Sequence, residues 1–115
     1  MSRDPGCIFC SIATGDVPAD VVERTERVVA FRDLTPQAPV HVLVVPVDHH
    51  RDVGSLAAAD AELLAEVVRT AAAVADRLCG GDHRLVFNTG EQAGQTVHHV
   101  HGHVLGGRSL GWPPG

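Results

Sequence analysis

The chain has 115 residues, of which 44% are hydrophobic and 20% are charged, and its formal net charge at pH 7 is −5. This length and composition predict a single globular domain over residues 1–115 that buries a core of its own. The acidic balance and the lack of a basic cluster argue against duplex nucleic acid and anionic membranes as partners.

The first half of the chain predicts one short helix and three strands. Residues 1–6 are expected to be flexible, and no long apolar run follows them, so they lack the pattern of a signal peptide. The longest apolar runs are too short to span a bilayer, and we expect a cytoplasmic location. The predicted segments are a helix over Cys7–Ala13 and strands over Val21–Glu23, Val28–Phe31 and Val40–Val45.

The second half begins with a long helix predicted over Asp60–Cys79, where apolar residues recur at spacings of three and four. Gly80 and Gly81 end it, as glycine does after a helix C-terminus. A strand over Arg84–Asn88, a glycine-rich loop over Thr89–Gln95 and a histidine-rich strand follow. This order of elements favours an α+β fold with a mainly antiparallel sheet.

The histidine-rich strand, His99–Leu105, contains three histidines that alternate with small or apolar residues. Side chains at i, i+2 and i+4 of a strand share one face, at roughly 6–7 Å per step, so His99, His101 and His103 are expected to form a row. Imidazole suits proton transfer near neutral pH, metal ligation and nucleophilic attack. The alternative is a solvated or metal-storing histidine tract.

Two cysteines form a Cys-x-x-Cys motif at Cys7 and Cys10, while Cys79 stands alone. In a reducing compartment such a pair more often binds metal or takes part in redox chemistry than forms a structural disulfide.

The glycine-rich loop runs directly into the histidine row. Glycines allow backbone N–H groups to point into one concavity, and such nests bind phosphate oxygens. Gln95 and Thr96 add an amide and a hydroxyl beside it. The alternative is an ordinary hairpin loop without a ligand.

The segment Gln95–Arg108 resembles the signature of the histidine triad (HIT) superfamily, and within it the branch of histidine triad nucleotide-binding proteins, which hydrolyse nucleoside phosphoramidates. The resemblance covers nearly the whole chain and implies a HIT-like fold with one long helix and one short N-terminal helix. The other matching segments are Ile8-Phe9, Val17–Ala19, Phe31–Asp33, Pro36–Pro39, His41 with Val42–Pro46, Asn88 and Trp112–Gly115.

The resemblance implies catalytic roles for four residues. His101 would be the nucleophile that attacks the α-phosphorus, with its tautomer fixed by a backbone carbonyl of the same strand. His103 would contact the phosphate, and His41 would support the histidine row. Thr96, where relatives usually carry serine, would donate a hydrogen bond to the phosphate or the leaving group.

A nucleotide site is implied by the same resemblance. Asp33 would bind the ribose hydroxyls, for which two carboxylate oxygens are well suited. Asn88 and Gln95 would lie at the phosphate edge of the site. The residues expected to enclose the base are Ile8, Phe9, Phe31 and Leu34, with ordinary core packing as the alternative for each.

A structural zinc ion is implied as well. Some family members hold zinc through two cysteines, a histidine just after the central strand and the first histidine of the triad, which here are Cys7, Cys10, His49 and His99. Two thiolates and two imidazoles suit tetrahedral Zn²⁺. Free thiols are the alternative, and the adjacent His50 and His98 leave the assignment of the histidines open by one position.

The activity implied is hydrolysis of purine nucleoside 5′-phosphoramidates or mixed adenylates through a covalent nucleotidyl-histidine, releasing nucleoside monophosphate. Relatives form homodimers through the long helix and a strand, so the C-terminal tail, residues 106–115, would lie near the partner's site. Two alternatives remain, a dinucleoside polyphosphate hydrolase and a nucleotide-sensing interaction protein.

Two positions depart from the family pattern. Gly102 stands where relatives place a bulky apolar residue, and it is expected to cost about 0.5–1 kcal/mol of local packing without disturbing the imidazole row. His98 occupies a position that is often aromatic in relatives.

Overall fold

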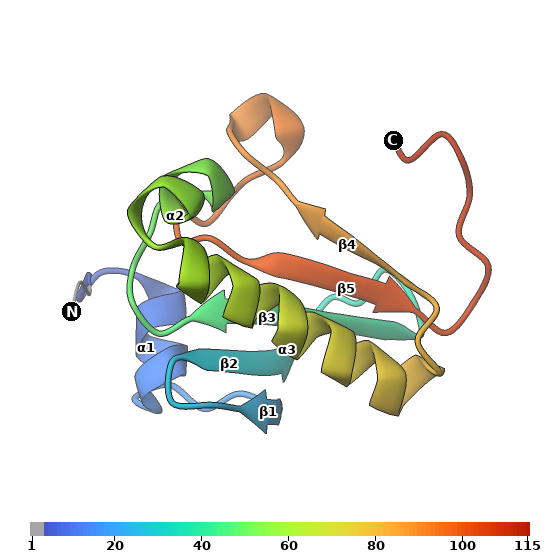
Figure 1. Ribbon diagram of the computed structural model, residues 1–115, viewed down its shortest axis with the longest axis horizontal. Helices are drawn as coiled ribbons and strands as arrows, with labels where there is room; N and C mark the ends of the chain where they lie inside the picture. Colours follow the sequence, from blue (N-terminus) through green and yellow to red (C-terminus); the bar gives the residue numbers. More distant parts are fainter. Residues whose placement is uncertain (1–3) are drawn as a thin grey trace.

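The computed structural model describes residues 4–115, which form a five-stranded antiparallel sheet with helices on both faces (Figure 1). The strands lie in the order β1-β2-β3-β5-β4, and the α+β fold with an antiparallel sheet is confirmed. The elements are α1 (Ile8–Thr14), β1 (Val21–Arg24), β2 (Val28–Arg32), β3 (Val40–Pro46), α2 (Val53–Ala59), α3 (Ala61–Cys79), β4 (His83–Phe87), a short 3₁₀ turn (Glu91–Ala93) and β5 (Gly102–Gly106).

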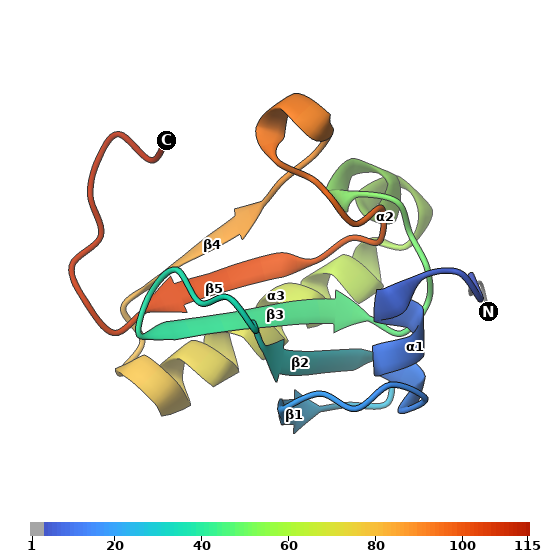
Figure 2. The ribbon, with the colours of Figure 1, turned by 180° about the vertical axis from the view of Figure 1, so that it is seen from behind.

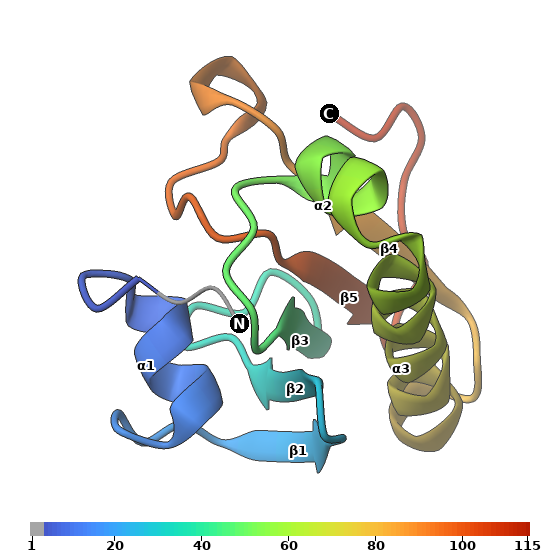
Figure 3. The same cartoon turned by 60° about the vertical axis from the view of Figure 1, so that its left-hand side comes forward.

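Helices α3 and α1 lie on opposite faces of the sheet, and each covers its own cluster of buried residues (Figures 2 and 3). Under α3, side chains such as Leu63 and Val67 pack against Val42 and Val104 of the sheet. Under α1, Phe9 belongs to the second cluster. Strand β3 is buried along its whole length between these two layers, which explains its continuous apolar sequence.

The residues that begin and end α3 can be recognised in the sequence. The Asp60 carboxylate accepts a hydrogen bond from the Leu63 N–H at 3.0 Å and so caps the first turn. Gly80 ends the helix with a φ of 70°, a left-handed conformation that glycine adopts without a steric penalty. The prediction of this helix is confirmed.

Helix α2 is an element that the sequence reading omitted. It has seven residues, and Leu56 is its buried member, so its apolar periodicity is too weak to recognise. The signal that could have revealed it is Asp52, whose carboxylate accepts from the Ser55 N–H at 2.8 Å as an N-cap.

The prediction that His99, His101 and His103 all lie in one strand is wrong, because β5 begins at Gly102. The chain before it bends, and the Val100 N–H bonds to the His50 carbonyl at 2.8 Å. The alternation of faces nevertheless persists through the bend. Val100 is buried in the cluster under α3, whereas the rings of His99 and His101 contact Phe9 on the opposite face.

Gly102 does not leave a packing defect, contrary to the expectation. A Cβ atom at this position would lie 2.9 Å from Leu85 Cδ1 and 3.1 Å from two ring carbons of Phe87. The neighbouring strand β4 therefore fills the volume that a larger residue 102 would take, and Phe87 pairs directly with Gly102 in the ladder.

Replacing Gly102 with valine is expected to destabilise the protein by about 1–3 kcal/mol, because overpacking forces Leu85 or Phe87 away from its position. Urea denaturation measures the change. Gly111→Ala is the control, since nothing lies within 4 Å of an added Cβ there. Combining Gly102→Val with Phe87→Val should recover much of the loss, and equal stability of wild type and Gly102→Val would contradict the account.

The expected flexibility of residues 1–6 concerns in part residues 1–3, which lie outside the described residues. Residues 4–6 form a turn in which Asp4 accepts hydrogen bonds from the N–H groups of Gly6 and Cys7, each at 3.0 Å. Between residues 4 and 115, no helix is both long enough and apolar enough to cross a membrane.

Candidate active site and metal cluster

His101 lies between the bend and β5, with its ring buried against Phe9 at a centroid distance of 4.9 Å. Its Nδ1 lies 2.8 Å from the His99 carbonyl oxygen, which can only accept a hydrogen bond. The proton of the neutral ring is therefore on Nδ1, and Nε2 carries a free lone pair. Burial lowers the pKa of His101, which keeps the ring neutral near pH 7 and ready to act as a nucleophile.

His103, in β5, faces His41 of the adjacent strand β3. Hydrogen bonds fix which nitrogen carries the proton in each of the two rings. The backbone N–H of Gln37 donates to Nδ1 of His41 at 3.0 Å, so the proton of the neutral His41 ring is on Nε2. That Nε2–H donates to Nδ1 of His103 at 2.9 Å. Nε2 of His103 therefore carries a hydrogen, which is available to an anionic ligand.

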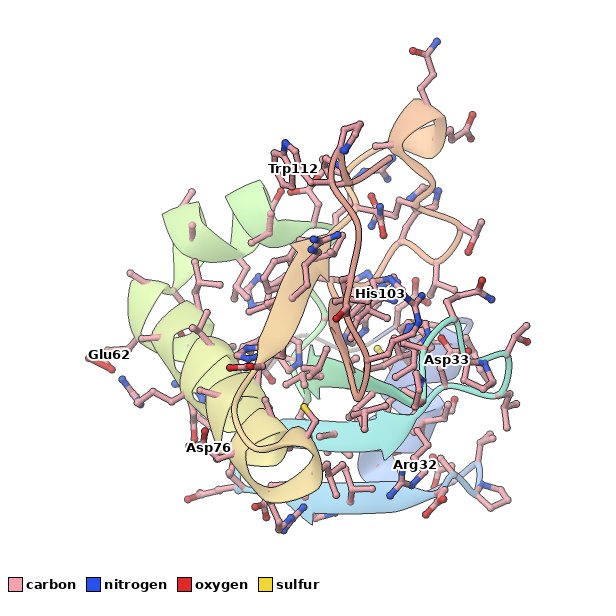
Figure 4. The ribbon with its side chains drawn as sticks, turned by 90° about the vertical axis from the view of Figure 1, so that its right-hand side faces the viewer. Arg32, Asp33, Glu62, Asp76, His103 and Trp112 are labelled. Atoms are coloured by element: carbon pink, nitrogen blue, oxygen red, sulfur yellow. The ribbon has the colours of Figure 1, made fainter. Side chains whose placement is uncertain are left out.

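His103 is held neutral by its surroundings. Burial, with smaller contributions from His101 and His41, lowers its pKa to about 4, while the Asp33 carboxylate acts in the opposite direction. Asp33 follows β2 and lies on the same side of the sheet as His103, opposite α3 (Figure 4). Its Oδ2 is 3.5 Å from Nε2 of His41.

The lowered pKa of His103 predicts a stability that depends on pH. Above pH 6.5, the ordinary pKa of histidine, the ring is neutral in both the folded and the unfolded chain. Between pH 6.5 and about 4 the unfolded chain binds a proton that the folded chain does not, so stability falls as the pH is lowered. Urea denaturation at several pH values should show a weaker pH dependence in His103→Gln than in the exposed control His83→Gln. Equal slopes of the free energy of unfolding against pH in the two variants would show that His103 is not the source of the pH dependence.

The loop between β4 and β5 is organised by side chains that bond to its backbone. Gln95 is buried, its Oε1 accepts from the Gly90 N–H at 3.0 Å, and its Nε2 donates to the carbonyls of Arg51 and Val97. Asn88 donates to the Ala93 carbonyl at 2.7 Å. The Gln95 amide thus bonds within the loop and to Arg51 before α2, while Thr96 is exposed at the end of the loop.

The four residues expected around the base divide into two pairs. Phe9 and Phe31 are buried in the cluster under α1, with their rings edge to face at 5.7 Å between centroids. Ile8 is 46% exposed and Leu34 is 98% exposed. Phe9 and Phe31 therefore pack in the core, whereas Ile8 and Leu34 are accessible to a ligand.

Four side chains that could hold a metal ion, those of Cys7, Cys10, His49 and His99, form a cluster in which the ligand atoms all lie within 4.8 Å of one another. Nδ1 of His99 is 3.3 Å from Sγ of Cys7 and 3.4 Å from Sγ of Cys10, and Nδ1 of His49 is 3.4 Å from Sγ of Cys10. The two histidines of the cluster are His49 and His99, and their neighbours His50 and His98 are not part of it.

The protonation of the cluster suits a metal. Nε2 of His99 donates to the Pro46 carbonyl at 2.9 Å, so Nδ1 has a lone pair directed at the cysteines, as in metal sites where a second ring nitrogen is held by a carbonyl. Burial lowers the pKa of His99 to about 4 and raises the pKa of the Cys10 thiol. A bound cation would offset the cost of ionising that thiol.

A second group of possible ligands, formed by Asp33, His41 and His103, does not suit a metal. Because Nδ1 of His41 accepts from the Gln37 N–H, the nitrogen that faces the other two groups carries a proton instead of a lone pair. In this group a hydrogen bond therefore joins His41 to His103, and the Asp33 carboxylate lies beside them.

The backbone carbonyl that the resemblance implied at His101 is that of His99. Two other backbone contacts were not predicted, namely the Pro46 carbonyl at His99 and the Gln37 N–H at His41. The Gln37 amide lies in the loop between Pro36 and Pro39, and this proline pair was the visible signal of a fixed loop conformation.

Comparison with known proteins finds one matching family sequence model, described as scavenger mRNA decapping enzyme C-term binding, over residues 6–111. An uncharacterised HIT-like protein of Synechococcus elongatus is 47% identical over 120 residues, covering 100% of both chains. A solved HIT family hydrolase from Legionella pneumophila has a TM-score of 0.91 and 43% identity, over 96% of this chain and 100% of that one. A histidine triad nucleotide-binding protein from Candida albicans has a TM-score of 0.80 and 26% identity, over 94% and 83%.

Proposed function

Since the chain belongs to the histidine triad family of nucleotide hydrolases, we propose that its substrates are purine nucleoside 5′-phosphoramidates or mixed adenylates and that it releases nucleoside monophosphate. The observation that carries the proposal is the tautomer of His101. Its Nδ1–H is bound to the His99 carbonyl, so a neutral ring presents a lone pair on Nε2.

In the first step, Nε2 of His101 attacks the α-phosphorus and the bond from phosphorus to the leaving nitrogen or acyl oxygen breaks. The Thr96 hydroxyl donates a hydrogen bond to the leaving group, and a leaving amine takes its proton from solvent through that hydroxyl. The nucleotidyl-histidine that forms carries a positive ring, and the His99 carbonyl stabilises its Nδ1–H. Nε2–H of His103 donates to a phosphate oxygen throughout.

In the second step, water attacks the phosphorus and the bond between phosphorus and Nε2 of His101 breaks. The water proton passes to solvent, and the neutral ring is restored with its proton still on Nδ1. Two displacements in series replace one difficult attack by water on the substrate.

The nucleotide is held by residues around this centre. Asp33 binds the ribose hydroxyls, Asn88 and the loop N–H groups lie at the phosphate, and Ile8 with Leu34 contacts the base. For Gln95 we assign a positioning role, since its amide organises the loop. Phe9 supports His101 from the core side of the site.

We assign a structural zinc ion to Cys7, Cys10, His49 and His99. Bound there, zinc would join the start of α1 to the segment before β5 and to the segment that follows β3. Its role is to hold the backbone of His99, whose carbonyl fixes the tautomer of His101. No catalytic step uses the metal.

A homodimer is supported by the open edge of the sheet and by the tail. Strand β4 lies at the edge, and Trp112 in the tail is 81% exposed with Arg84 5.8 Å from the centre of its ring (Figure 4). Pairing of β4 with a second copy would bury this edge. Analytical ultracentrifugation at micromolar concentration should give twice the chain mass, and a monomer would contradict the assembly.

A substrate panel tests the function. A fluorogenic adenosine phosphoramidate should be hydrolysed with a far higher kcat/KM than a dinucleoside polyphosphate. If the polyphosphate is the better substrate, the dinucleoside polyphosphate hydrolase replaces the proposal, and if neither turns over, the nucleotide-sensing alternative does.

A further inference from the structure

The carboxylate of Asp33 has two oxygens with different surroundings. Oδ1 accepts from the Thr35 N–H at 2.7 Å, which fixes the orientation of the group in a local turn. Oδ2 lies 3.5 Å from Nε2 of His41, a ring that is 4% exposed, whereas the Asp33 side chain is 21% exposed. One side of the carboxylate therefore faces a buried imidazole and another faces solvent.

The N–H on Nε2 of His41 donates to Nδ1 of His103 at 2.9 Å, and Oδ2 of Asp33 lies 3.5 Å from the same nitrogen. A carboxylate at this distance favours the tautomer with hydrogen on Nε2, in the same sense as the Gln37 N–H on the other side of the ring. With that tautomer fixed, His103 is obliged to accept at Nδ1 and to keep its own hydrogen on Nε2.

We propose that Asp33 is a positioning residue for the phosphate-facing histidine as well as a ribose ligand, acting through His41 to hold His103 as an Nε2–H donor. The inference rests on the proposed function for its ribose and phosphate ligands. It adds a link between sugar recognition and the chemical step, because one carboxylate contacts the ribose and also orients the donor to the phosphate.

The titratable groups that face His103 are His41, His101 and Asp33, and Asp33 is the carboxylic acid among them.

The kinetic test compares kcat and KM of two proteins, each with two substrates. Wild type and Asp33→Asn are assayed with the adenosine phosphoramidate and with its 2′,3′-dideoxy analogue, which cannot contact Asp33 through hydroxyls. Asparagine keeps an Oδ1 acceptor for the Thr35 N–H, so the local turn is preserved. We expect Asp33→Asn to lower kcat for the dideoxy substrate by about tenfold or more with little change in KM.

The matched control is Asp20→Asn, which removes an exposed carboxylate paired with Arg32 at 3.4 Å and should leave both substrates unaffected. A ribose-only role for Asp33 would give the opposite pattern, a higher KM for the ribose substrate and no effect on the dideoxy substrate. That result overturns the inference.

A second measurement needs no turnover and so separates this inference from the proposed function. Imidazole ¹⁵N shifts report which ring nitrogen carries hydrogen. In wild type, His103 should show a bare Nδ1 and a protonated Nε2. Asp33→Asn should lower the share of this tautomer, although the Gln37 N–H still favours it. An unchanged His103 spectrum in Asp33→Asn overturns the inference, whether or not the phosphoramidate is a substrate.

Discussion

Replacing His101 with alanine is expected to lower kcat for the adenosine phosphoramidate by at least about 10⁴-fold, because the variant has no group that can form the covalent intermediate. The lone pair on Nε2 is available only in the tautomer that the His99 carbonyl imposes. The rate is measured by fluorescence under single-turnover conditions. Binding of nucleoside monophosphate should persist, because the ribose and phosphate ligands remain.

The matched control for this variant is His83→Ala, an exposed histidine in β4 that should leave the rate unchanged. Circular dichroism verifies that His101→Ala is folded. A folded His101→Ala protein with the wild-type rate would show that another residue is the nucleophile.

Replacing Cys7 with serine is expected to remove bound zinc and to destabilise the fold by about 3 kcal/mol or more, because structural zinc contributes directly to the free energy of folding. Wild type should contain about one zinc ion per chain by elemental analysis. Cys7 also caps α1, since its Sγ accepts from the Cys10 N–H at 3.4 Å, so part of the loss is local to that helix.

Cys79→Ser is the control for the zinc variant. Its Sγ bonds to the Asp82 carbonyl at the far end of α3, away from the cluster, so metal content should stay at the wild-type value. A wild-type protein purified without metal chelators that contains no metal, and whose stability does not respond to added zinc, would contradict the structural zinc site.

An element of the fold could be predicted from the sequence where one pattern of residues accounts for most of that element's stability. The apolar periodicity and the caps of α3 identify it because nineteen residues repeat the same pattern. The strand β3 is identified by its run of β-branched residues. Helix α2 was missed because Leu56 alone carries the burial signal, and the start of β5 was misplaced because alternation of faces continues through a bend that lacks ladder pairing.

The candidate site, too, could be predicted only in part. The resemblance implied the four possible metal ligands, and the structure places them together. The resemblance implied the carbonyl that fixes the proton of His101, which is that of His99. The proton positions on His99, His41 and His103 could not be predicted, because the Pro46 carbonyl and the Gln37 N–H decide them. The sequence likewise could not show that Phe87 fills the space beside Gly102, since that volume comes from another strand.

The central claim is that a covalent nucleotidyl group forms on Nε2 of His101. Rapid quenching of the enzyme with excess adenosine phosphoramidate, followed by mass spectrometry of proteolytic peptides under alkaline conditions, tests it most directly. The account predicts one adenylyl group on the peptide that contains His101, with loss of the adduct on longer incubation and none in His101→Ala. An adduct on a different residue, or steady turnover in which the quenched enzyme never carries one, would contradict it.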